Sequence, residues 1–251
     1  MALNVALYGV RPGWAMTERG ASTLKRSERS LTIGPSSLAW DGDALTVDVA
    51  ELTFPIPSRF RGRIRVRPRS LARPALALDP AGRHIWSPIA TRADVEVDFR
   101  LPALSWKGSG YVDSNWGDAP LEEGFASWQW SRAHLSDEEV VLYEGLRRDG
   151  SRFAHGLRFD RTGAERPIPL PPEVALPKTF WRMPRTTRAD DGAAVAIRRT
   201  WEDTPFYART SLSTRLFGEP AEAVHESIDL DRLKNPLVKL MLPFRMPRIA
   251  G

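Results

Sequence analysis

The stretch WKGSGYVDSNWGDAPLEEGFASWQW, residues 106–130, contains four of the nine tryptophans of the chain. Its first half is typical of a strand that runs into a turn, and its second half alternates polar and aromatic side chains. Side chains two positions apart on a strand point to the same face, so Tyr111 shares a face with Asp113, and Trp128 with Trp130. The stretch therefore predicts β-structure with a carboxyl group beside a phenol and indoles. On composition alone, it equally fits a tryptophan-rich core in which Asp113 caps a turn.

The same period of two recurs along the chain. Five arginines alternate with apolar residues and glycine at 59–67, and acidic residues alternate with apolar ones at 94–99. Such alternation predicts antiparallel strands with one polar face, and many short strands predict a barrel or a sandwich. The arginine face fits two interpretations: pairing with the acidic face of the 94–99 strand, which we favour, or contact with lipid headgroups.

Turn signals and prolines organise the second half. Further strands are predicted at residues 139–147 and 152–160, joined across Asp149-Gly150, and at 193–201 and 207–215. The proline-rich stretch 166–178 cannot be a central strand, because proline lacks the N–H that a sheet requires. It predicts a surface crossover or a lid. Residues 136–139 fit a helix start or a turn, and residues 230–242 a short helix.

Composition excludes several classes of site. The chain of 251 residues has no cysteine, so disulfides and thiolate metal sites are excluded, and its four histidines lack metal-ligand spacing. No apolar run approaches the ~20 residues of a membrane span, and no signal peptide is visible. The net charge of +5 fits an anionic membrane surface better than nucleic acid, for which no motif is found. Residues 233–246, apolar with interspersed Lys and Arg, fit a packed tail or an interfacial anchor.

A second fragment, residues 82–88, reads GRHIWSP and places His84 and Trp86 on one face of an extended segment. Together with the later GYVDSNWGDAPLEEGFASWQWSRA, it resembles the bacterial carotenoid 1,2-hydratases. The resemblance extends to the blocks LNVALYG, WAMTERG and GPSSLAWDGDALTVDVAE, and so covers roughly the first half of the chain. It implies that a His-x-Trp and a Tyr-x-Asp pair, here His84, Trp86, Tyr111 and Asp113, are linked to catalysis.

The resemblance also implies the fold and the setting. We expect an all-β protein of two lipocalin-like antiparallel units in tandem, with residues 1–118 carrying both motifs and residues 119–251 forming the second unit. Members of the family usually carry an additional N-terminal segment before the LNVALYG block, and we expect this chain to lack it, because the block begins at Leu3. The implied substrate is an acyclic carotenoid of the neurosporene or lycopene type, with water as co-substrate. The implied location is peripheral to the inner membrane of a bacterium.

Hydration of an isolated alkene requires a proton delivered to carbon, a tertiary carbocation and then water, and it needs no cofactor. A carboxyl donates only when neutral, and an aromatic, dry pocket raises its pKa above the usual value of about 3.9. We therefore expect Asp113, set among Trp106, Tyr111 and Trp116, to be the acid. Trp86 would face the cation, and His84 and Tyr111 would position the acid and the water.

Two other functions share this architecture. A related lipocalin-like terpenoid or polyketide cyclase or isomerase would use the same proton donor, but its cation would close a ring instead of taking up water. A non-catalytic lipophile carrier would bind without turnover. The mass of the product separates hydration from cyclisation, and binding without turnover would identify a carrier.

Overall fold

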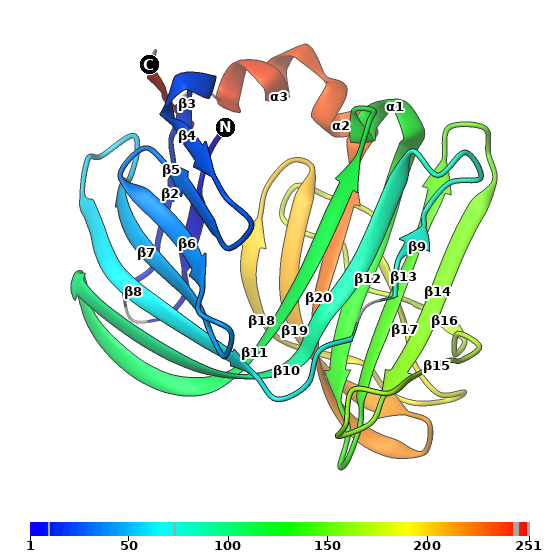
Figure 1. Cartoon of the computed structure of the whole chain (residues 1–251). Coiled ribbons are helices and arrows are strands. Elements are labelled where there is room, and N and C mark those ends of the chain that lie inside the picture. Colours follow the sequence, from blue (N-terminus) through cyan, green and yellow to red (C-terminus); the bar gives the residue numbers. More distant parts are fainter. Residues whose placement is uncertain (10, 73, 243–245, 250–251) are drawn as a thin grey trace. The chain divides into compact units, whose positions relative to one another are not determined.

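The computed structural model describes residues 1–9, 11–72, 74–242 and 246–249. The described chain consists mostly of antiparallel β-strands, and its helices are short (Figure 1). The prediction of an all-β protein is therefore confirmed. The residues at 243–245, which belong to the apolar C-terminal stretch 233–246, lie outside the described residues.

One eight-stranded sheet is built largely from the first half of the chain. Its strands follow the order β11-β10-β8-β7-β6-β5-β4, and β9 pairs with β10 beside this path. The strands are β4 (Leu24–Arg26), β5 (Ser30–Ile33), β6 (Ser36–Trp40), β7 (Leu45–Leu52), β8 (Arg59–Pro68), β9 (Leu76–Ala77), β10 (His84–Leu101) and β11 (Ala103–Gly117).

A seven-stranded sheet is built from the second half. Its order is β15-β14-β13-β12-β20-β19-β18. The strands are β12 (Phe125–His134), β13 (Glu139–Arg147), β14 (Arg152–Phe159), β15 (Glu165–Pro167), β18 (Ala196–Asp203), β19 (Tyr207–Leu216) and β20 (Glu219–Asp229). The predicted hairpin across Asp149-Gly150 is confirmed, since β13 and β14 pair antiparallel on either side of it.

Short elements complete the structure. The small pairs are β1 (Asn4–Leu7) with β2 (Gly13–Met16), β16 (Glu173–Ala175) with β17 (Thr186–Arg188), and β3 (Glu18–Arg19) parallel to β21 (Arg248–Ile249). The helices are α1 (Leu121–Gly124), α2 (Leu230–Lys234), α3 (Pro236–Met241) and a 3₁₀ turn at Ala21–Thr23. The helix expected at 230–242 is thus divided at Asn235. Residues 136–139 form a turn that enters β13, which settles the alternative left open by the sequence.

The chain divides into two compact units that are not consecutive in sequence. The first unit consists of Met1–Arg69, Arg92–Tyr111 and Lys239–Gly251, and the second of Ser70–Thr91 and Val112–Val238. The division is discontinuous because the long strands β10 and β11 contribute residues to both units. Compactness of contacts is not a measure of independent folding, so the two domains expected at 1–118 and 119–251 stay a prediction.

In the first unit, the arginine face of β8 is neutralised by acidic neighbours. β8 pairs with β10 so that Arg67 lies opposite Asp94 and Arg65 opposite Glu96, as the favoured interpretation expected. Most of the ion pairs, however, reach the other neighbour, β7, and the turn before it: Arg63 with Asp48 (2.7 Å), Arg65 with Asp41 (3.1 Å) and Arg67 with Asp43 (2.8 Å). The arginine face of β8 is therefore a solvated, ionic face of the sheet, because these side chains are well exposed.

In the second unit, the proline-rich crossover covers one face of the seven-stranded sheet. Leu176 joins the buried cluster formed there by Leu142, Leu212 and other apolar residues, with Ile168 packed against it. The stretch 166–178 contributes only the short strands β15 and β16, so the prediction that it cannot be a central strand is confirmed. The residues that this sheet contributes to the candidate site lie on its opposite face.

Candidate active site

Trp86 and Asp113 are joined by a hydrogen bond in the second unit. Trp86 lies near the start of β10 and is fully buried, and Asp113 lies on β11, which neighbours β10 in the sheet. The indole Nε1–H donates to Asp113 Oδ2 over 2.9 Å. Because an indole nitrogen can only donate, Oδ2 is the acceptor, and an acidic proton on this carboxyl would lie on Oδ1. Asp113 is partly buried.

An aromatic cluster of the seven-stranded sheet contacts Trp86 through Tyr143. Tyr143 of β13 packs edge-on against Trp86 with ring centroids 5.2 Å apart, and it also contacts Trp128 and Phe153. Burial raises the pKa of Tyr143, and the negative charges of Asp113 and Glu226 raise it further, so the phenol keeps its proton. The result is an aromatic wall with a protonated hydroxyl and two carboxyl groups in electrostatic reach.

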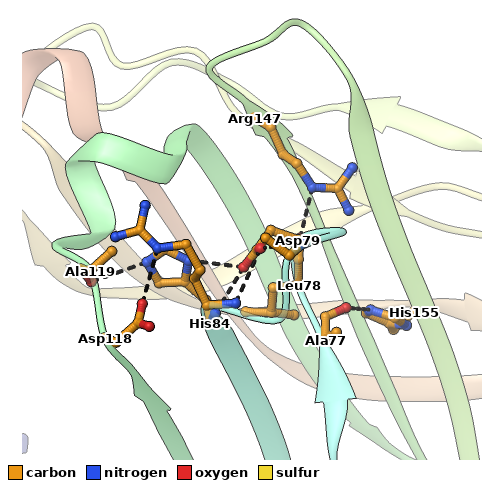
Figure 2. Close-up of polar contacts among 10 residues, drawn as sticks. Ala77, Leu78, Asp79, His84, Asp118, Ala119, Arg147 and His155 are labelled. Atoms are coloured by element: carbon orange, nitrogen blue, oxygen red, sulfur yellow. Dashed lines mark hydrogen bonds and ion pairs between the residues drawn. The ribbon is translucent and has the colours of Figure 1, made fainter.

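His84 is held by two acceptors (Figure 2). Its Nδ1 lies 3.0 Å from Asp79 Oδ2, and its Nε2 lies 3.1 Å from the carbonyl oxygen of Ala119. Burial alone would raise the pKa of Asp79, but hydrogen bonds from the backbone of Arg83 and from the ring and backbone of His84 outweigh it and lower the pKa. The two ring nitrogens thus contact a carboxylate oxygen on one side and a backbone carbonyl oxygen on the other. His84 therefore ties the turn before β10 to the turn after β11.

Two glycines allow the backbone to approach this histidine. A Cβ at Gly124 would lie 2.9 Å from His84 Cε1, and a Cβ at Gly117 would lie 2.2 Å from the carbonyl oxygen of Arg83. Both distances are shorter than real Cβ contacts allow, so a side chain at either position would displace the histidine or its strand. The glycines at 117 and 124 in the opening stretch thus serve the packing of His84.

The structure brings together some of the sequence-predicted residues. Trp86 and Asp113 meet directly, whereas the ring nitrogens of His84 contact Asp79 and Ala119. Tyr111 lies on β11, two residues before Asp113, and belongs to the first compact unit.

The expected surroundings of Asp113 need correction. Trp106 and Trp116 are about half exposed, so they do not enclose a dry pocket as expected. Both lie on β11, where the strand has an open face.

Sequence reasoning missed three residues of this region. Tyr143, Glu226 and Asp79 were not singled out, since each lies in an ordinary alternating strand or turn. Glu122 and Glu123, in the middle of the opening stretch, lie in the first turn of α1. Within the described ranges, no three histidine, aspartate or glutamate side chains gather to hold a metal ion, and no helix is long and apolar enough to cross a membrane.

Comparison with solved structures gives the fold class of the protein. A crystal structure of a protein assigned as AttH from Nitrosomonas europaea superposes with a TM-score of 0.57 at 12% identity, covering 86% of this chain and 75% of that one. A likeness at this identity concerns the fold alone, and it supports the lipocalin-like class.

Sequence comparison identifies the family. The model of the family "Carotenoid hydratase CrtC" matches residues 1–251, so the chain belongs to this family. The acyclic carotenoid 1,2-hydratase of Thiocapsa roseopersicina is 52% identical over 252 residues, which cover 100% of this chain and 62% of that protein. The corresponding protein of Cereibacter sphaeroides is 39% identical over 250 residues, covering 99% of this chain and 89% of that protein. The chain thus spans less than two thirds of the Thiocapsa relative.

Proposed function

We propose that this chain adds water to the terminal C1–C2 double bond of an acyclic carotenoid of the neurosporene or lycopene type. The observation that carries the proposal is the hydrogen bond from the buried indole of Trp86 to Asp113, within an aromatic wall. Membership of the carotenoid hydratase family supports the substrate class. The reaction balances without a cofactor, since an alkene and one water give a tertiary alcohol.

Asp113 acts as the acid in this proposal. The proton on Oδ1 passes to C2 of the terminal double bond, and the π electrons form the new C–H bond and leave a tertiary cation at C1. The Trp86 N–H stabilises the carboxylate that remains, because hydrogen bonds to charged groups are stronger than those to neutral ones. Each aromatic face next to the cation contributes roughly 0.5–2 kcal/mol of stabilisation.

His84 acts through position rather than by contact with the reacting atoms. Its two hydrogen bonds fix the beginning of β10, two residues before Trp86. Loss of this anchor would let the indole move away from Asp113. Tyr111, two residues before Asp113 on β11, is proposed to orient the acid from the same strand face.

The function is tested by incubating the chain with a lycopene- or neurosporene-type carotenoid in D₂O. We expect a product heavier by one D₂O, with one deuterium bound to carbon C2 and the hydroxyl at C1, as read by mass spectrometry and NMR. A product of unchanged mass would instead indicate the cyclase or isomerase, and bound but unconverted carotenoid would indicate the carrier.

A peripheral membrane contact would give access to such a substrate. In the second unit, Phe180 is 85% and Leu237 71% exposed, and Trp181 lies beside Phe180. Arg232 of α2 donates to the carbonyl oxygen of Trp181 over 2.7 Å, which holds this loop against the helix that leads to Leu237. The exposed side chains of Arg182 and Lys234 add positive charge. Apolar side chains beside cations suit an anionic lipid surface.

We expect replacement of Phe180 and Leu237 by serine to weaken binding to anionic vesicles at least about tenfold, because each apolar side chain contributes roughly 1.5–3 kcal/mol when buried. Vesicle co-sedimentation measures the effect. Leu71→Ser, also an exposed leucine of the second unit, is the matched control. Equal binding of the double variant and the wild type would contradict the assignment of this surface.

A further inference from the structure

Glu226 of β20 lies in a row of side chains that crosses the seven-stranded sheet. It is directly opposite Trp130 of β12 on one side and Arg209 of β19 on the other, and Trp130 is in turn opposite Tyr143 of β13. Directly paired residues of antiparallel strands point to the same face. Glu226 therefore shares the sheet face of Tyr143, the face opposite to the one that the proline-rich crossover covers.

This row leads to the acid of the proposed reaction. Tyr143 packs edge-on against Trp86, and Trp86 donates to Asp113. The charge of Asp113 acts on both Tyr143 and Glu226. A second carboxyl group thus faces the same aromatic wall as Asp113, in the same compact unit.

The surroundings of Glu226 favour a carboxylate with strong affinity for a proton. Burial raises its pKa, and the charges of Asp113 and Glu202 act in the same direction. Arg209, with its Nε 3.2 Å from Glu226 Oε1, and a hydrogen bond from Tyr207 lower it. Arg209 keeps the group available as a carboxylate, and burial makes that carboxylate a stronger base than an exposed one.

We propose that Glu226 is the general base of the site, which holds the attacking water and accepts its proton. This inference rests on the proposed hydration and assigns the half of the reaction that Asp113 does not perform. Asp113 begins the cycle neutral and Glu226 begins it ionised.

The proton balance closes over one cycle. Asp113 gives its proton to C2, an electron pair of the water forms the C1–O bond, and one water proton passes to the Glu226 carboxylate. The cycle then leaves Asp113 ionised and Glu226 neutral. Return of one proton from Glu226 to Asp113 through solvent restores the first state, so the pair holds one proton before and after each turnover and none while the cation exists. Like charges in reach of each other disfavour ionisation of both, which suits such a pair.

The first test is Glu226→Gln in the full chain, assayed with the acyclic carotenoid. We expect kcat to fall about 100-fold or more with KM unchanged, since a general base contributes typically 10²–10⁴-fold. Glu222→Gln is the matched control, because Glu222 lies on the same face of β20 but is exposed, and it should keep wild-type kcat. Wild-type kcat in Glu226→Gln would overturn the proposal.

Arg209→Met provides a second variant that keeps the base in place. Removal of the positive charge raises the pKa of Glu226, so the ascending limb of the kcat profile should move to higher pH and activity should recover there. The other groups that face Glu226, namely Tyr207, Glu202, Asp113 and Tyr143, stay unchanged. A uniform loss of activity at every pH would mean that the ion pair is only structural, and would overturn the proposal.

A measurement without substrate separates this inference from the proposed function. Infrared titration of the carboxyl groups in the free protein should show one protonated carboxyl, that of Asp113, which disappears in Asp113→Asn. In Glu226→Gln the midpoint of this Asp113 carboxyl should move to lower pH, because the negative charge of Glu226, which disfavours ionisation of Asp113, is gone. An unmoved midpoint overturns the coupled pair even if the chain hydrates carotenoids. A moved midpoint in a chain that hydrates none supports the pair and contradicts the hydratase.

Discussion

Asp113→Asn is expected to lower the kcat of carotenoid hydration by roughly 10²–10⁴-fold, the range that a positioned general acid contributes. The amide keeps the size of the carboxyl and can still accept the hydrogen bond that Trp86 donates to Oδ2. It cannot transfer a proton to an alkene carbon. Substrate binding should therefore change little, and the loss should appear in kcat, as measured with saturating carotenoid.

Asp98→Asn is the control for this variant. Asp98 is an exposed aspartate on β10, far along the strand from Trp86, so its amide should leave both kcat and KM unchanged. If Asp113→Asn turned over carotenoid at the wild-type rate, the acid would have to be another group. Glu226, the second carboxyl on this aromatic wall, would be examined next.

The period of two in the sequence was sufficient to predict the fold class. In β8 it placed the arginines on one face, which was expected to pair with the acidic face of residues 94–99, whereas the register of β8 with β10 came only from the structure. The sequence did not predict that each compact unit is made of separate segments of the chain, because this division depends on how far β10 and β11 extend. A strand of 18 residues can serve two units, and no local signal marks where one unit ends within it.

The candidate site also contains residues that could be predicted from the sequence and residues that could not. Trp86 and Asp113 could be proposed because the His-x-Trp and Tyr-x-Asp motifs resemble those of the carotenoid hydratases, and each motif is local in the sequence. Tyr143 and Glu226 could not, since they reach the site only through the pairing of strands far apart in the sequence. The partners of His84 were hidden for a related reason: Asp79 belongs to a turn, and the carbonyl of Ala119 to the backbone, which no residue type reveals.

Arg19→Met is expected to destabilise the first unit by about 3–5 kcal/mol, because it leaves a buried carboxylate without its cation. Arg19 donates to both carboxylate oxygens of Glu51 (3.1 and 2.7 Å), and the side chains of the two residues are 9% and 0% exposed. Ser36 Oγ also donates to Glu51, over 2.7 Å, but a hydroxyl does not neutralise the charge. Thermal and urea unfolding measure the change. The expected loss is large compared with the free energy of unfolding of a typical folded protein, roughly 5–15 kcal/mol.

Two further variants test whether the loss of stability in Arg19→Met comes from the unpaired charge of Glu51. The double variant Arg19→Met with Glu51→Leu should recover most of the loss, because apolar replacement of a buried ion pair is often neutral or stabilising. Recovery should stop short by about 1 kcal/mol, since the buried Ser36 hydroxyl loses its acceptor. Arg63→Met breaks the Asp48 pair, whose side chains are 64% and 44% exposed, and should change the stability little because the pair is solvated. If Arg63→Met cost as much as Arg19→Met, burial would not explain the difference. If the double variant were as unstable as Arg19→Met alone, the loss would lie in the packing of the arginine stem rather than in the charge of Glu51.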